Sequence, residues 1–127
     1  MQELHLFEYA VIRVVPRVER DEFINVGAIL YCAKKKYLKA VYHIDEQRLQ
    51  AFCPKLDVAD VRCHLDSLML ICAGDKSSGP IGQLDLPSRF RWLTAMRSTV
   101  IQTSRVHPGF CLDPETKLQA LFEEQVL

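Results

Sequence analysis

Two apolar runs of β-forming residues, joined by a short charged link, constrain the fold of this chain more than any other feature. The runs span Tyr9–Val15 and Ile24–Cys32, and both are rich in valine and isoleucine. Runs that are apolar on both sides of the pleat are typical of strands covered on both faces. Because the link is short and begins at Pro16, which cannot donate to a strand ladder, the runs are predicted to pair as an antiparallel hairpin.

The hairpin is expected to continue into a third strand. Lys34–Lys36 predicts a turn and Tyr37–His43 predicts a strand, which makes a three-stranded N-terminal meander. Gly27, inside the second run, predicts either a β-bulge or a close approach of two backbones.

After the meander, the apolar spacing changes to three and four residues, which indicates helices. Asp45 is expected to cap a short helix that stops before Pro54, and Asp57 a longer helix that closes at Gly74. A loop is expected over 75–87, followed by a helix from Ser88 to Arg97 with Phe90 and Met96 inward. Phe90 and Trp92 are both expected to be core residues. A strand is then expected over Thr99–Val106, ending at Pro108-Gly109, and a last helix from Asp113-Pro114.

These elements predict an α+β fold in one domain, residues 1–127. The antiparallel sheet has about four strands, three from the meander and one from the C-terminal part, with three or four helices packed on it. The length of 127 residues suits a single domain with a substantial core.

Composition disfavours several classes of function. Sixteen Lys and Arg balance sixteen Asp and Glu, so no overall field attracts nucleic acid or anionic lipid. The five cysteines match neither a zinc ribbon nor a disulfide framework, and the four histidines have no helical metal-ligand spacing. No leader or membrane-spanning stretch is present, so we expect a cytoplasmic protein without metal or cofactor.

The first polar set lies around the charged link. If the hairpin centres on Glu19, Arg13 is set opposite or diagonal to Asn25, and an arginine inside an apolar strand needs a partner such as Glu22. A structural arginine tied to Glu22 and Asn25 is the favoured interpretation. The alternative is an anion site in which Arg13 and Arg20 hold a phosphate or carboxylate.

The second polar set lies near the C-terminus. Its members are Arg97, Ser98, Gln102, Ser104 and His107. A hydrolase would use Ser98 or Ser104 as nucleophile and His107 as base. The Gly-x-Ser-x-Gly elbow is absent, so catalysis by this set is disfavoured and no catalytic residue is assigned.

Two sequence blocks carry a resemblance to a known family. In the first block the residues that match the family pattern are Tyr9, Arg13 and Pro16, followed by Arg20, Glu22, Phe23, Asn25 and Gly27. In the second block the matching residues are Arg89, Phe90, Trp92, Leu93, Arg97, Ser98, Gln102, Ser104, His107 and Asp113-Pro114. Together they resemble a bacterial family known as domain of unknown function 3037. Met96 and Arg105 stand where that family has proline.

The resemblance implies a partner rather than a reaction. The resemblance implies that such domains are often encoded beside HipA-like kinase homologues and bind such a kinase in trans, as a missing subdomain, chaperone or neutraliser in a toxin–antitoxin-like pair. We therefore expect a non-enzymatic interaction domain, and a homo-oligomer stays open. The alternative is a small-molecule or nucleotide site where Arg13, Arg20, Arg97 and Gln102 converge on an anion. The candidate binding residues are Arg13, Arg20, Glu22, Asn25, Arg97, Gln102 and His107.

Overall fold

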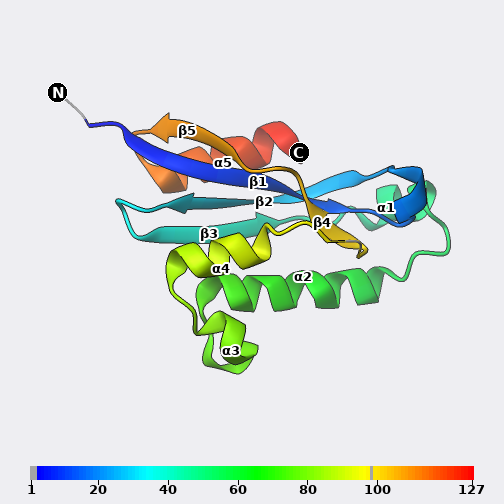
Figure 1. The fold of residues 1–127 in the computed structure, drawn as a ribbon. Coiled ribbons are helices and arrows are strands. Elements are labelled where there is room, and N and C mark those ends of the chain that lie inside the picture. Colours follow the sequence, from blue (N-terminus) through cyan, green and yellow to red (C-terminus); the bar gives the residue numbers. More distant parts are fainter. Residues whose placement is uncertain (1–2, 98) are drawn as a thin grey trace.

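One antiparallel sheet of five strands forms the centre of the molecule (Figure 1). The computed structural model describes residues 3–97 and 99–127. The strands are β1 (His5–Val14), β2 (Ile24–Cys32), β3 (Tyr37–Tyr42), β4 (Ile101–Thr103) and β5 (His107–Cys111). β1 is central: β2 and then β3 lie on one side of it, and β4 and β5 pair in succession with its other edge. The predicted α+β class and the N-terminal meander are confirmed.

A bulge in β2 sets the register of the first hairpin. Ile12 pairs with Gly27 whereas Arg13 pairs with Asn25, so one residue of β2 is left over between them. A Cβ atom on Gly27 would lie 2.3 Å from the carbonyl oxygen of Val41 on β3. Gly27 therefore serves both purposes that the sequence suggested, a bulge and a close approach of two backbones.

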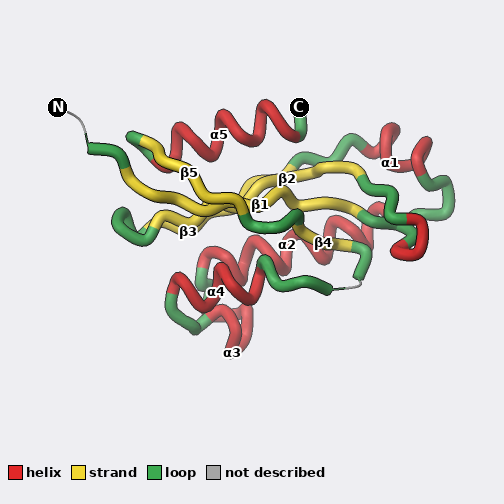
Figure 2. The backbone as a smooth tube through the Cα atoms, turned by 45° about the horizontal axis from the view of Figure 1, so that its top comes forward, coloured by secondary structure: helices red, strands yellow, loops and turns green. Residues whose placement is uncertain are grey.

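Helices cover both faces of the sheet (Figure 2). One face packs against α2 (Val58–Ala73) and α4 (Leu86–Leu93), and the other packs against α5 (Pro114–Gln125). Because successive side chains of a strand point to opposite faces, Ile12 enters the first core and Phe7 the second. This two-sided burial explains why the first two strands are apolar along most of their length.

Aspartates begin the four longer helices. Asp45, Asp57, Asp85 and Asp113 each accept a hydrogen bond from the backbone N–H three residues later, at 3.0 to 3.1 Å. Asp45 opens α1 (Glu46–Phe52), which lies beside η1 (Val18–Arg20) at one end of the sheet (Figure 1). Gly74, with φ of 71°, closes α2 in the left-handed conformation that glycine adopts most easily.

The region after α2 is more helical than the sequence suggested. The expected loop over 75–87 contains η2 (Lys76–Ser78) and α3 (Gly79–Gly82). α4 begins before Ser88 because the Asp85 carboxylate is the cap, with a proline in the first turn. It also ends at Leu93 rather than Arg97, so Met96, expected inward, is 85% exposed.

Phe90 is fully buried as expected, but Trp92 is 38% exposed and is not a core residue.

The C-terminal strand is also divided. The predicted strand over Thr99–Val106 shortens to β4, and His107–Cys111, expected to include a turn, forms β5. Between them the hydroxyl of Ser104 accepts a hydrogen bond from the N–H of Val11 at 2.9 Å and donates to the carbonyl of Arg105. The Ser104 hydroxyl thus replaces the backbone acceptor that a continuous strand would offer to Val11, and β4 and β5 can both pair with β1.

Candidate functional site

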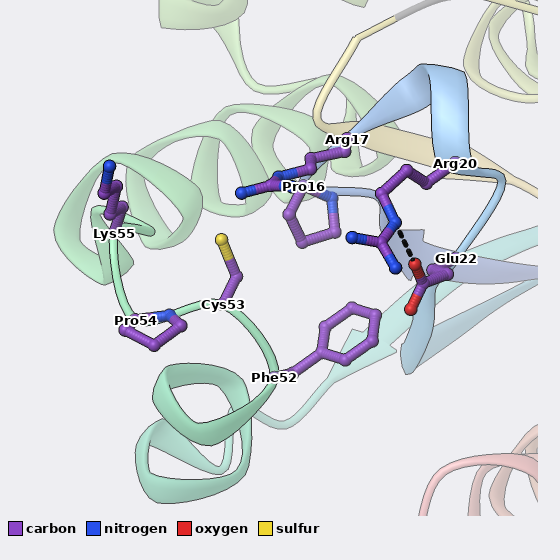
Figure 3. Close-up of a pocket in the computed structure, with 8 residues that line it drawn as sticks. All are labelled: Pro16, Arg17, Arg20, Glu22, Phe52, Cys53, Pro54 and Lys55. Atoms are coloured by element: carbon purple, nitrogen blue, oxygen red, sulfur yellow. Dashed lines mark ion pairs between the residues drawn. The ribbon is translucent and has the colours of Figure 1, made fainter.

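An open cationic cleft lies where β1 ends (Figure 3). It encloses about 280 Å³ between two chain segments, the link from β1 to β2 and the link from α1 to α2. Its lining residues are Pro16, Arg17, Arg20, Glu22, Phe52, Cys53, Pro54 and Lys55. Three cations thus stand against one carboxylate, with prolines and an aromatic ring between them.

The first wall of the cleft is a single turn of 3-10 helix. Pro16 follows the end of β1, and the N–H of Arg20 donates to the carbonyl of Arg17 at 3.1 Å. Side chains three residues apart in a 3-10 helix lie one above the other. Arg17 and Arg20 are therefore presented from the same side of η1. Asp21, with φ of 55°, then turns the chain toward β2.

The second wall is a hydrogen-bonded turn between α1 and α2. The N–H of Cys53 donates to the carbonyl of Leu49 at 2.9 Å, and the N–H of Leu56 donates to the carbonyl of Cys53 at 3.0 Å. The side-chain amide of Gln50 donates to the carbonyl of Leu56 at 3.1 Å. These bonds fix the turn that carries Lys55 and the half-buried Cys53.

The charges of the cleft are only partly compensated. Nε of Arg20 lies 2.5 Å from a carboxylate oxygen of Glu22, and both side chains are about half exposed (Figure 3). Arg17 and Lys55 are exposed, and within the described part of the chain neither forms an ion pair. The cleft therefore keeps a net positive charge, which favours an anionic group.

Arg13 lies outside this cleft, on the face of the sheet that α5 covers. Its guanidinium carbon lies 3.9 Å from the centre of the Phe23 ring, so a cation–π contact replaces the expected ion pair. The prediction of Glu22 as the partner is wrong, because Glu22 pairs with Arg20 on the other side of the turn. Burial lowers the pKa of Arg13, and the charge of Asp21 opposes that shift.

Three candidate residues form one row across the sheet. Arg13 pairs with Asn25 on β2, as predicted, and with Gln102 on β4. The Asn25 amide donates to the backbone carbonyl of Gln125 at 3.1 Å, and the Gln102 amide donates to that of Thr99 at 2.9 Å. Both amides thus hold backbone segments in place, and Asn25 ties the end of α5 to the sheet.

Arg97 and His107 occupy other places. The guanidinium of Arg97 lies over Trp92, 4.5 Å from the ring centre, and donates to the Trp92 carbonyl. The exposed ring of His107 lies beside that of Tyr9, with centres 5.3 Å apart. Ser98 falls outside the described residues, and the hydroxyl of Ser104 is engaged with backbone groups as described above. Of the candidate residues, the cleft brings together Arg20 and Glu22.

Sequence reasoning missed most of the cleft. Arg17 lies in the same link as the candidates Arg20 and Glu22 but was not itself a candidate, and neither were Phe52, Cys53 and Lys55. Periodicity along the chain places residues on faces of one element, and gives no information on which two links meet in space. The nearest signal was Pro54, which stops α1 and so exposes the turn that follows.

The described residues offer no other evident chemical centre. Among them, no group of three or more His, Cys, Asp and Glu side chains is placed to hold a metal ion. All five cysteines are free thiols. None of the described helices has the length and apolar character needed to cross a membrane.

The fold and the cleft define a class of protein, an α+β domain on a five-stranded antiparallel sheet with a cationic cleft at one end. The chain belongs to the family described as "Protein of unknown function (DUF3037)", whose model matches residues 9–126. The resemblance drawn from the two sequence blocks is thereby confirmed. No curated protein and no solved structure matches the chain.

Proposed function

We propose that the protein is a cytoplasmic interaction domain whose cationic cleft receives an acidic segment of a protein partner. The observation that carries the proposal is the pair of uncompensated cations, Arg17 and Lys55, on opposite walls of one cleft that also holds Arg20. Free thiols throughout the chain fit the reducing compartment.

The chemistry of the cleft favours carboxylates. Guanidinium groups bind carboxylates and phosphates with paired, charge-assisted hydrogen bonds. Pro16, Phe52 and Pro54 add apolar surface for the rest of a peptide chain. Arginine and aromatic side chains are frequent among the residues that dominate protein interfaces. A short acidic peptide with an apolar neighbour would complement both parts of the cleft.

Volume and openness favour a protein segment over a nucleotide. Pockets that enclose small organic ligands hold about 300–1,000 Å³. This cleft, at about 280 Å³ and open to solvent, is at the lower limit of that range. A few side chains of a partner fit it better than a nucleotide, which would leave its base without cover. A nucleotide or small anionic ligand stays the second candidate, because Arg17, Arg20 and Lys55 together would also hold a phosphate.

The gene neighbourhood implied by the family resemblance suggests the first partner to test. The family resemblance implies a HipA-like kinase homologue encoded nearby, which the domain would bind in trans. The proposed mode is capture of an acidic surface segment of that kinase by the cleft, and it requires no chemical step.

The test is affinity purification of the tagged protein from its own cells, followed by binding measurements with the purified partner. Arg17→Glu and Lys55→Glu should each weaken binding by at least about tenfold, because each reverses a charge at the cleft. Binding should also weaken as salt rises. Arg105→Glu, an exposed arginine between β4 and β5, is the matched control and should bind like the wild type.

Two results would overturn the proposal. One is equal binding by the cleft variants and by Arg105→Glu. The other is the absence of any stoichiometric protein partner together with a thermal shift on addition of phosphate or ATP that the cleft variants lose. The second result would establish the small-ligand alternative at the same site.

A further inference from the structure

A second surface stands apart from the cleft, at the opposite end of β1. Leu6 on β1 pairs with Phe110 on β5, so the two side chains lie next to each other on one face of the sheet. They are 55% and 66% exposed, and Leu4 and Leu112, which flank them, are 58% and 51% exposed. We name these four residues the edge patch.

The edge patch is an uncovered continuation of the core. It occupies the sheet face that α2 and α4 cover further along, where Ala10 and Ile12 are fully buried. The helical layer stops at Glu8, whose carboxylate holds Arg91 of α4 by two hydrogen bonds of 3.0 Å. Beyond this ion pair, Leu6 and Phe110 point to the same side of the sheet as Ala10 and Ile12, but none of the described helices covers them.

The edge patch is comparable in size to the largest apolar patch on a typical monomer. Four large apolar side chains, each more than half exposed, amount to on the order of 400 Å² of apolar surface. That equals the largest patch on a typical monomeric protein, and such a patch is commonly an interaction site. Burying it would return these side chains to the environment that the rest of the same sheet face has.

The partner is expected to cover a face rather than extend the sheet. The backbone of Val11 bonds to Ser104 on the β4–β5 side, so the odd-numbered residues of β1 direct their backbone groups toward β5. His107, Gly109 and Cys111 therefore bond to β1, and Pro108 faces the free edge. Because Pro108 has no N–H to offer, addition of another strand is disfavoured there.

The charges around the edge patch favour a second copy of this chain. Two ion pairs lie beside the patch, Glu8 with Arg91 and Glu3 with Lys34. With a formal net charge of +0, two copies also approach without overall repulsion. We propose that the chain forms a two-fold homodimer in which the edge patches of two copies pack face to face.

Such a dimer should be weak. Two patches with their borders bury on the order of 1,000 Å², the lower end of specific interfaces. A dimer that forms at tens of micromolar and dissociates on dilution is the expected behaviour for that area.

The test is sedimentation equilibrium from about 1 to about 200 µM, a range that brackets the expected dissociation constant. The wild type should pass from monomer to dimer, and Phe110→Glu should raise the dissociation constant at least about tenfold because it places a charge at the centre of the patch. Met96→Glu is the matched control, since it alters an exposed apolar residue outside the patch and should dimerise like the wild type.

Leu6→Glu provides an independent variant on β1 in case Phe110→Glu does not fold, which circular dichroism will show. A wild type that stays monomeric at every concentration overturns the proposal. Folded Phe110→Glu and Leu6→Glu variants that dimerise as strongly as the wild type also overturn it. Because the edge patch and the cleft share no residue, the outcome is independent of the partner proposed above.

Discussion

Arg13 is the residue on which structural and functional interpretations differ most. Its guanidinium rests on the Phe23 ring, and its Nε atom is buried without a hydrogen-bond partner among the described residues. An anion-binding arginine would direct these donors into open space. The geometry instead makes Arg13 a link between β1 and the segment that leads into β2.

A double-mutant cycle tests this role. Arg13→Met keeps the aliphatic stem without the charge, and Phe23→Leu removes the ring. The two changes should each lower the free energy of unfolding and show a coupling energy of about 0.5–2 kcal/mol, the range for a partly desolvated cation–π pair. Urea denaturation supplies all four values. A coupling energy within error of zero would mean that the contact does not stabilise the fold, and would return Arg13 to the list of candidate ligand residues.

At the scale of the elements, the stability of the helices depends on pH through their aspartate caps. Hydrogen bonds from the side chain and backbone of Thr116 lower the pKa of Asp113 from its ordinary 3.8, and Ser88 lowers that of Asp85 in the same way. A carboxyl whose pKa is lower in the folded state adds stability at pH values above 3.8 and loses it as pH falls through the folded pKa. The N-terminus of α5 should therefore loosen below about pH 4.

Asp113→Asn checks this prediction. Asparagine is an equally favoured N-cap and does not titrate. The variant should be slightly less stable than the wild type at pH 7, because it lacks a negative charge at the helix N-terminus. Its stability should fall less steeply between pH 5 and pH 2.5, as measured by urea denaturation across that range. Parallel pH curves for the two proteins would show that the Asp113 cap does not contribute to acid sensitivity.

At the same scale, the sequence predicted elements well where one signal acted alone. Asp57 and Gly74 each gave one local signal and α2 lies where they placed it, and β2 lies where its apolar run placed it. β5 was missed because Pro108-Gly109 reads as a turn, whereas an edge strand accepts both residues. The cleft was missed for a different reason, since it depends on the packing of two links that are far apart in sequence.

For the whole molecule, protection against hydrogen exchange should follow the position of each strand. From Tyr9 to Val14, β1 is covered on both faces and paired along both edges, so the amides of this part should exchange only when the molecule unfolds globally. The amide of Phe110 faces the free edge of β5 and should exchange much faster. Exchange measured by NMR at low protein concentration, where a dimer would dissociate, tests both statements. Slow exchange at Phe110 under those conditions would contradict the strand arrangement described for β5.

The late pairing of β1 has a consequence for synthesis on the ribosome. β1, β2 and β3 emerge first, but the strands that complete the other edge of β1 come from the last third of the chain, with His5 paired to Cys111 roughly a hundred residues later. Until then the nascent chain carries an apolar strand with an open edge, the kind of surface that pairs with the wrong neighbour. A ribosome-bound chaperone that shields this edge would therefore raise the yield of folded protein most when translation is slow.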